Sequence, residues 1–291
     1  MKIRECFKEA VKLLTEAGIA SARLDSEVLL QEVLQYGKAE LYLKMNEEMI
    51  CPDRFFSLVE ARQTHQPIAY IIGEKEFMGL SFQVDKRVLI PRPETELLAE
   101  AVIAEYKEAK QPIRILDLGT GSGALAVSLA KFLPQARVTA VDISPAALEV
   151  AKSNARRLGA LDRVDFRQGD LWLALAEAEE PFDVIVSNPP YISEREMAGL
   201  DRDVLDYEPH LALEAKENGL EFYRLISERL EEFLIPGGLI AFEVGWKQAS
   251  EVAWLLILTD LIEKTEIRKD YAGIERVVLG WRKNEKQQIN S

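Results

Sequence analysis

A strand, a glycine-rich turn and a helix, joined without a break, constrain the fold of this chain more than any other feature. The apolar run Ile113–Leu118 is typical of a buried parallel strand, and the apolar stretch Ala124–Phe132 is typical of a helix. The turn between them consists of Gly119, Thr120, Gly121, Ser122 and Gly123. Glycines let the backbone approach a ligand closely, and the helix start supplies free N–H groups that can receive a carboxylate. The pattern therefore predicts a nucleotide-type cradle at one edge of an α/β sheet.

Two aspartates flank this cradle. Asp117 lies in the strand just before the glycines, and Asp142 follows a second apolar strand, Arg137–Val141. The spacing of Asp142 from the glycines suits an acid that binds ribose hydroxyls. A nicotinamide dehydrogenase would share this pattern, but it would not explain Asp117.

A double-proline turn further along the chain indicates the chemistry. Asn188, Pro189, Pro190 and Tyr191 follow the apolar run Phe182–Ser187, so we expect them at the carboxyl end of a strand. Each proline holds φ at about −65° and removes a backbone donor. The Asn188 amide and the Pro189 carbonyl then form a fixed pair of acceptors, which suits a planar NH2 group. With the glycine cradle, this turn favours S-adenosylmethionine as the ligand and an amide or amino nitrogen as the methyl acceptor.

The chain predicts a small helical domain followed by a larger α/β domain. Residues 1–66 show helical spacing of apolar residues and predict a bundle with helices at Ile3–Leu14, Leu24–Tyr36 and Pro52–Arg62. Residues 67–90 predict a β-hairpin linker, with strands at Tyr70–Ile72 and Leu80–Val84. In residues 91–283 strands alternate with helices, beginning with a helix over 94–108, which indicates a doubly wound, mostly parallel sheet. Residues 284–291 are expected to form a polar tail.

Composition favours an enzyme of the cytoplasm. The two cysteines, Cys6 and Cys51, provide no disulfide framework, and the two histidines, His65 and His210, lack metal-ligand spacing, so we expect no metal site. No stretch is apolar enough to span a membrane, and the first residues lack the apolar centre of a signal peptide. A formal net charge of −13 argues against a nucleic-acid substrate, although a local basic patch could exist. Without heptads, a monomer is expected.

Several segments together resemble one enzyme family. Asp117–Gly123 resembles the first motif of class I methyltransferases, and Asn188–Tyr191 resembles the motif of their nitrogen-methylating branch. Further segments resemble the HemK/PrmC family: 67–73, 76–77, 88–96, 219–220, 223–224, 243–245 and 270–276. The resemblance covers nearly the whole chain and implies a seven-stranded class I methyltransferase sheet. It also implies transfer of a methyl group from S-adenosylmethionine to the Gly-Gly-Gln glutamine of peptide-chain release factors 1 and 2.

The resemblance assigns roles to individual residues. Cofactor binding is implied for Asp117, Gly119, Thr120, Gly121, Ser122, Gly123, Asp142, Asp170, Leu171 and Asn188. Asp170 would approach the adenine amino group, while Leu171 stands where the family often has an aromatic ring, and Trp172 could belong to the core or to the cofactor wall. Substrate binding is implied for Asn188, Pro189, Pro190 and Tyr191, and catalysis for Asn188, Pro189 and Tyr191. Pro91–Pro93 and Thr95 could close over the methionine end or serve only as a helix entry.

Three alternatives to a release-factor methyltransferase remain at this point. A sister enzyme that acts on a ribosomal-protein glutamine shares most of these motifs. A nucleic-acid methyltransferase could use the same pair of acceptors for an exocyclic NH2 group. A cofactor-binding protein without transfer activity is the third, although the intact glycines and Asn188 argue against it.

Overall fold

The computed structural model describes residues 1–176 and 178–284, which form two compact units. The first unit contains Met1–Glu74 and, from much later in the chain, Leu200–Glu208. The second contains Lys75–Gly199 and Pro209 onward. Of the predicted polar tail, residues 285–291 lie outside the described residues.

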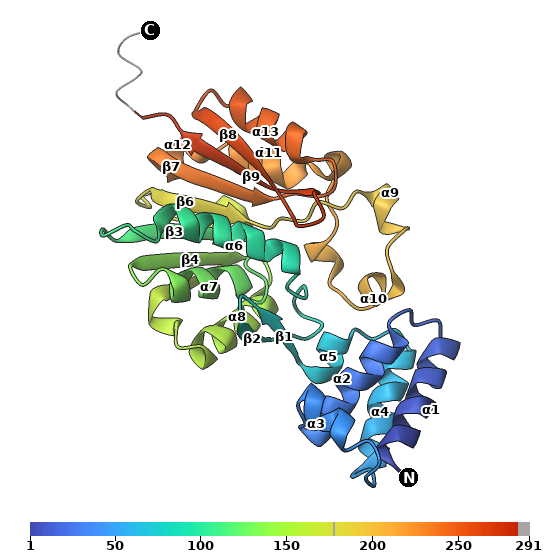
Figure 1. Cartoon of the computed structure of the whole chain (residues 1–291). Coiled ribbons are helices and arrows are strands. Elements are labelled where there is room, and N and C mark those ends of the chain that lie inside the picture. Colours follow the sequence, from blue (N-terminus) through green and yellow to red (C-terminus); the bar gives the residue numbers. More distant parts are fainter. Residues whose placement is uncertain (177, 285–291) are drawn as a thin grey trace. The chain divides into compact units, whose positions relative to one another are not determined.

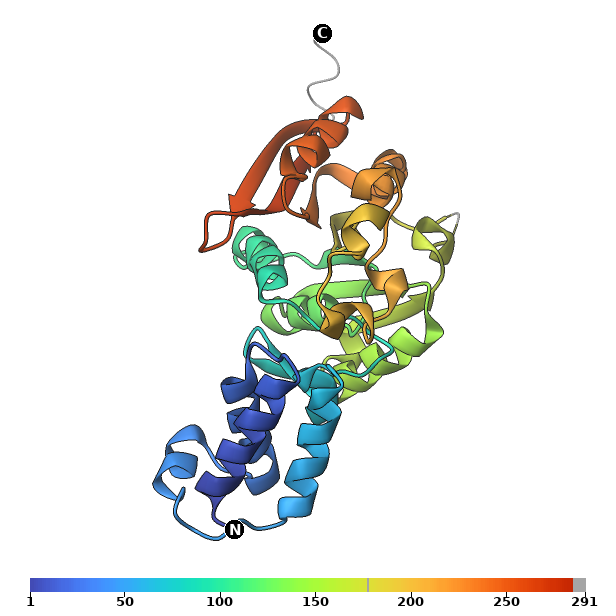
Figure 2. The ribbon, with the colours of Figure 1, turned by 90° about the vertical axis from the view of Figure 1, so that its right-hand side faces the viewer.

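The first unit is a helical bundle around one apolar core. Its helices are α1 (Ile3–Glu16), α2 (Ala22–Leu34), α3 (Lys38–Leu43), α4 (Pro52–Gln63), α5 (Ile68–Ile72) and α10 (Arg202–Leu205). The long helices α1, α2 and α4 pack side by side in Figures 1 and 2 and bury side chains such as Phe7, Leu30 and Phe55. The structure confirms the three helices that the apolar spacing predicts.

The late segment 200–208 is attached to the bundle by polar contacts. The buried Arg62 guanidinium donates through Nε to Asp25 Oδ2 at 2.7 Å and pairs through Nη2 with Asp203 Oδ2, also at 2.7 Å. The Tyr207 hydroxyl donates to the Thr64 carbonyl at 2.8 Å. Residues more than a hundred positions apart in sequence therefore share one unit.

The prediction of a first hairpin strand at Tyr70–Ile72 is wrong. Residues 70–72 belong to helix α5, which starts after Pro67 and ends at Gly73, whose φ of 84° only a glycine adopts readily. The hairpin is instead formed by β1 (Glu74–Phe77) and β2 (Leu80–Gln83). The rings of Phe77 and Phe82 pack edge to face and are buried. The charged segment 74–77 is therefore a strand, and Phe77 is the side chain that packs it against the core.

The second unit is built on a seven-stranded sheet of order β5-β4-β3-β6-β7-β9-β8. The strands are β3 (Ile113–Leu118), β4 (Ala136–Asp142), β5 (Val164–Gln168), β6 (Phe182–Ser187), β7 (Leu234–Glu243), β8 (Ile262–Lys269) and β9 (Glu275–Arg282). The five strands from β5 to β7 are parallel, and β9 runs antiparallel to both neighbours. The predicted doubly wound, mostly parallel fold is confirmed.

Helices cover both faces of this sheet (Figure 1). One face packs against α6 (Pro93–Tyr106), α7 (Ala124–Phe132) and α8 (Pro145–Arg157), and the other against α11 (Glu221–Ser227), α12 (Leu230–Phe233) and α13 (Ala249–Leu258). The remaining short elements are η1 (Leu161–Arg163), η2 (Leu171–Ala174), α9 (Glu194–Met197), η3 (His210–Ala212) and η4 (Glu217–Gly219). Within the described residues, every helix is too short or too polar to cross a bilayer.

The register of the central strands determines which loops meet. Leu118 pairs with Ser187 between β3 and β6, and Ser187 pairs with Phe242 between β6 and β7. The glycine turn after β3, the Asn188 turn after β6 and the end of β7 therefore lie next to one another at the carboxyl edge, where open α/β sheets bind ligands.

Candidate active site

A pocket lies at this carboxyl edge and includes both predicted motifs. It is lined by Leu89, Pro91, Arg92, Thr95, Asp117, Gly119, Thr120, Gly121, Ser122, Ala124, Leu125 and Asn188. The lining comes from the chain before α6 and the first turn of α6, from the end of β3 through the glycine turn to the start of α7, and from the residue after β6. Segments distant in sequence thus form one concave surface.

Asp117 is a buried acid at the floor of the site. Its side chain belongs to β3 and is 1% exposed, and the Thr120 hydroxyl donates to its Oδ2 at 2.6 Å. Burial raises the pKa of Asp117 to about 7, against the opposing effect of the Thr120 hydrogen bond. A cation bound nearby would stabilise the carboxylate, so the position suits the positively charged part of a ligand.

The three glycines of the turn serve different purposes. Gly119 and Gly121 have φ of 77° and 54°, and a Cβ added to either would meet nothing within 4 Å. That space is available to a ligand. Gly123 begins α7, and its added Cβ would lie 3.0 Å from the Ala151 Cβ of α8, so this glycine permits close helix packing. Ser122 is buried, and its carbonyl accepts from Asn154.

Asp142 stabilises the glycine turn directly. Its Oδ2 accepts from the Gly121 N–H at 2.8 Å and its Oδ1 from the Ser144 N–H at 2.9 Å. Each carboxylate oxygen can accept more than one hydrogen bond, so two ribose hydroxyls could still be accommodated. The ribose role stays a prediction.

The residues after β5 separate into core and surface. Asp170 is exposed, and Leu171 is half-buried with φ of 47°, a strained value for a bulky side chain. Trp172 is 5% exposed, stacks on Phe233 with ring centroids 4.8 Å apart, and donates to the Leu225 carbonyl at 3.0 Å. Trp172 therefore belongs to the core, which answers the question that the sequence leaves open.

Asn188 lines the pocket from the turn that follows β6. The Asn188 Nδ2 donates to the Thr95 hydroxyl oxygen at 3.1 Å. Among the described residues, none donates a hydrogen bond to Asn188 Oδ1 or to the carbonyl of the buried Pro189. Pro190 is half-buried. Both predicted acceptors are thus available to an incoming NH2 group.

Residues from later in the chain hold Tyr191 in place. The Gln248 Nε2 donates to the Tyr191 carbonyl at 3.0 Å, while Gln248 Oε1 accepts from the Gly245 N–H at 3.0 Å. A Cβ on Gly219 would lie 2.2 Å from the Tyr191 carbonyl oxygen, and a Cβ on Gly245 would lie 2.9 Å from the Tyr191 ring. Sequence reasoning missed Gln248, because only the strand order brings the end of β7 beside this turn.

Glu243, the last residue of β7, completes the group. It is 2% exposed, and its Oε1 lies 3.5 Å from the Tyr191 hydroxyl. Burial raises the pKa of Glu243 to about 7 and is the largest cause of the shift.

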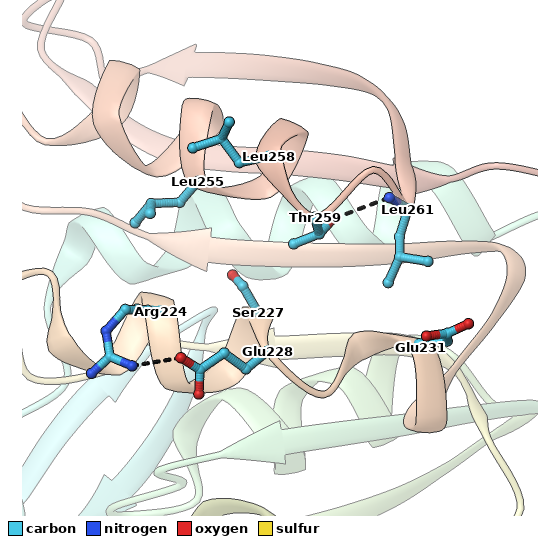
Figure 3. Close-up of a pocket in the computed structure, with 8 residues that line it drawn as sticks. All are labelled: Arg224, Ser227, Glu228, Glu231, Leu255, Leu258, Thr259 and Leu261. Atoms are coloured by element: carbon cyan, nitrogen blue, oxygen red, sulfur yellow. Dashed lines mark hydrogen bonds and ion pairs between the residues drawn. The ribbon is translucent and has the colours of Figure 1, made fainter.

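A second pocket contains none of the predicted site residues (Figure 3). Its lining comes from α11 to α13 and the chain that follows them, and includes Arg224, Glu228 and Leu258. Arg224 is paired with Glu228 at 2.5 Å and with Glu217 at 2.7 Å, so its charge is already compensated. The described residues also include no cluster of His, Cys, Asp and Glu that could hold a metal ion.

The fold and the site together define a methyltransferase domain. A family model described as "Methyltransferase domain" matches residues 109–278, and one described as "PrmC N-terminal domain" matches residues 5–73. The N-terminal domain of human METTL16 in complex with SAH has a similar structure, with a TM-score of 0.52 and 19% identity over 77% of this chain and 83% of that one. At this identity the likeness shows the fold alone.

Close relatives identify the family. A release factor glutamine methyltransferase of Clostridium acetobutylicum is 43% identical over 97% of this chain and 99% of that protein. One from Moorella thermoacetica is 40% identical over 98% of this chain and 100% of that protein. The chain belongs to the release factor glutamine methyltransferase family.

Proposed function

We propose that this protein transfers a methyl group from S-adenosylmethionine to the side-chain nitrogen of the glutamine in the Gly-Gly-Gln motif of release factors 1 and 2. The observation that carries the proposal is the Asn188 turn, since Asn188 lines the pocket and no described residue donates a hydrogen bond to its Oδ1 or to the Pro189 carbonyl. The names of the relatives supply the protein substrate.

The residues of the pocket fit S-adenosylmethionine. The open space over Gly119 and Gly121 leaves room for the ligand backbone, and the start of α7 can receive its carboxylate. Asp117 would lie near the cationic end, Asp142 would accept from the ribose hydroxyls, and Asp170 with Leu171 would border the adenine. When bound, this cofactor supplies an electrophilic methyl group on a sulfonium sulfur.

An amide nitrogen is a poor nucleophile, so the protein must compensate by positioning it. Asn188 Oδ1 and the Pro189 carbonyl would each accept one N–H of the glutamine, which fixes the direction of the nitrogen. The same two dipoles stabilise the positive charge that develops on nitrogen during attack. Pro190 keeps the turn stiff, and the Tyr191 ring would pack against the glutamine side chain.

A protein substrate suits this chain better than a nucleic acid. The formal net charge of −13 is unfavourable for binding phosphates. We propose that the bundle unit docks the release factor, that the enzyme acts as a monomer, and that it works in the cytoplasm, where release factors function.

Methyl transfer from labelled S-adenosylmethionine to purified release factor tests the proposal. The control is a release factor whose Gly-Gly-Gln glutamine is replaced, and the comparison substrates are ribosomal protein and DNA. We expect label on the intact release factor only. Label on ribosomal protein or DNA instead would overturn the assigned substrate, and no label on any substrate would overturn the transfer activity.

A further inference from the structure

Asn154 is a fully buried polar side chain that connects the glycine turn to the β1–β2 hairpin. It lies on α8 and is 0% exposed. Its Oδ1 accepts from the Gln83 N–H at 2.7 Å, and its Nδ2 donates to the Gln83 carbonyl at 3.0 Å and to the Ser122 carbonyl at 2.9 Å. Burial of an amide is costly unless its polar groups are hydrogen-bonded, and here both N–H groups and the oxygen have partners.

The two bonds to Gln83 fix which way the Asn154 amide faces. A reversed amide would place Nδ2 against the Gln83 N–H and Oδ1 against the Gln83 carbonyl, so that donor would meet donor and acceptor would meet acceptor. The main chain of Gln83 therefore allows one orientation. In that orientation the second N–H of Nδ2 is directed at the Ser122 carbonyl.

Asn154, rather than helix α7, orients the Ser122 carbonyl. The first main-chain bond into α7 runs from the Val127 N–H to the Gly123 carbonyl at 2.8 Å, and no main-chain N–H of the described residues donates to the Ser122 carbonyl. Because a peptide unit is planar, fixing this carbonyl also fixes the Gly123 N–H, which donates to the Thr120 carbonyl at 2.8 Å. The peptide between Ser122 and Gly123 is thus held at both ends.

This peptide lies among the main-chain donors that the pocket can offer to a ligand. Ser122, Ala124 and Leu125 line the pocket, and among the described residues none accepts a hydrogen bond from their main-chain N–H groups. Such free N–H groups at a helix start can receive a carboxylate. Their directions depend on the peptide that Asn154 holds.

We infer that Asn154 is a positioning residue for the cofactor, which holds the Ser122 carbonyl so that the N–H groups at the start of α7 are preorganised for the carboxylate of S-adenosylmethionine. The inference rests on the proposed function for the identity of this ligand. Preorganised donors bind more tightly because they need not be ordered when the ligand arrives.

A positioning role and a packing role predict different losses when Asn154 is replaced. If Asn154 only packed α8 against the hairpin, its loss would affect every part of the ligand alike or none of them. Loss of positioning should instead affect the amino-acid end alone, since the ribose and adenine are expected at Asp142, Asp170 and Leu171.

Calorimetric binding of two ligands tests this difference without any methyl transfer. S-adenosylhomocysteine has the amino-acid end of the cofactor, whereas 5′-methylthioadenosine has the same nucleoside and sulfur without it. We expect Asn154→Ala to weaken the binding of S-adenosylhomocysteine about tenfold, the equivalent of one net hydrogen bond, and to leave the affinity for 5′-methylthioadenosine unchanged.

A second variant covers the case in which the alanine protein does not fold. Asn154→Leu has a side chain of similar volume, so it fills the buried space, but it cannot donate to Ser122. We expect the same selective loss of S-adenosylhomocysteine binding in this variant.

Ser153→Ala is the matched control. The Ser153 hydroxyl donates to Gln83 Oε1 at 2.8 Å, so it joins the same helix to the same hairpin residue without a hydrogen bond to the glycine turn. This variant should bind both ligands like wild type.

The outcomes separate this inference from the proposed function. Asn154 variants that bind S-adenosylhomocysteine like wild type, an equal loss for both ligands, or the same selective loss in Ser153→Ala would overturn the inference and leave the proposed function standing. A wild-type protein that binds neither ligand would reject the cofactor and the inference with it. The selective loss in an enzyme that does not methylate release factor would retain the positioning role and reject the assigned substrate.

Discussion

The glycine turn after β3 and the Asn188 turn after β6 lie side by side at the carboxyl edge of the sheet, but they are built differently. The glycine turn uses its own main chain, with Asp117 and Asp142 from the two adjacent strands. The Asn188 turn depends on residues from four separate segments, namely Thr95, Gly219, Glu243 and Gln248. The first needs only the pairing of β3 with β4, whereas the second also needs β7 and segments from elsewhere in the chain.

This difference teaches how each turn should respond to substitution. In the glycine turn the space beside the main chain is open for the ligand, so a substitution there should change cofactor affinity. In the Asn188 turn the space is filled by other parts of the chain, so a change should act on both stability and rate. The five substitutions below, one of them a matched control, test that contrast.

The largest effect is expected for Asn188→Ala, which removes one acceptor without touching the glycine turn. The rate constant of methyl transfer should fall about a hundredfold or more, by analogy with loss of one preorganised donor in other enzymes. Cofactor affinity, measured by calorimetry, should fall by a much smaller factor than the rate, because Asn188 is only one of the residues that line the pocket. Near-normal turnover with normal cofactor binding would show that Asn188 does not have the assigned role.

Gly219→Ala tests whether distant segments support the Asn188 turn. The added Cβ would lie 2.2 Å from the Tyr191 carbonyl oxygen and 2.3 Å from Gln248 Nε2, so the turn must shift. Overpacking of this kind lowers the free energy of unfolding by about 1–3 kcal/mol. Urea denaturation and single-turnover kinetics should both show a loss.

Gly273→Ala is the matched control for this change. Gly273 has φ of 81°, close to the 89° of Gly219, but its added Cβ would meet nothing within 4 Å. It should lose only about 1 kcal/mol from backbone strain and keep its rate. Equal losses in the two variants would contradict the support that we assign to Gly219.

Gly119→Ala tests the opposite behaviour at the glycine turn. Its φ of 77° resembles that of Gly273, and its added Cβ also meets no protein atom within 4 Å. The two variants should therefore lose similar stability. Only Gly119→Ala should weaken cofactor binding, by about tenfold, because its methyl group would occupy space that the ligand needs. Unchanged cofactor affinity would indicate that the ligand does not approach this glycine.

The smallest effect is expected for Asp117→Asn, measured as stability against pH in the ligand-free protein. Asp117 has a folded pKa of about 7 against an ordinary 3.8, so the unfolded chain releases this proton first as the pH rises. Its contribution to stability is thus present at low pH, declines between about pH 4 and 7, and stays lost above. The asparagine cannot ionise, so the variant should be more stable than wild type at pH 8 by about 1 kcal/mol, since a buried amide is still costly.

Urea titrations at pH 5 and pH 8 would measure this difference. The advantage of the variant should be larger at pH 8 than at pH 5. A constant difference between the two proteins would mean that Asp117 titrates normally, and cofactor affinity should fall in the variant in any case.

The same contrast explains how much could be predicted from the sequence. The strands Ile113–Leu118 and Phe182–Ser187 match the structure because each is a short apolar run with clear ends. The strand predicted at Tyr70–Ile72 failed because a proline and a left-handed glycine enclose one helical turn. The pattern of apolar residues alone does not show that the flanking proline and glycine favour a helix over a strand.

The candidate site divides in the same way. The pocket at the glycine turn follows from a contiguous motif, and the acceptors of Asn188 and Pro189 follow from the stiffness of the turn. The contacts of Glu243 and Gln248 with Tyr191 could not be found, since they depend on the adjacency of β6 and β7 rather than on spacing along the chain. The individual roles of the site residues stay predictions until they are tested.

The attachment of residues 200–208 to the bundle has a consequence for how such a protein can evolve. The chain passes between the two units after Glu74, after Gly199 and after Glu208, so the bundle is not a detachable N-terminal module. A gene that lost its first 74 codons would leave Asp203 without Arg62 and Tyr207 without Thr64, in the connection that follows the Asn188 turn. The bundle and the catalytic unit are therefore expected to be inherited together. Replacing the bundle with another N-terminal domain by gene fusion would require a redesigned 200–208 segment.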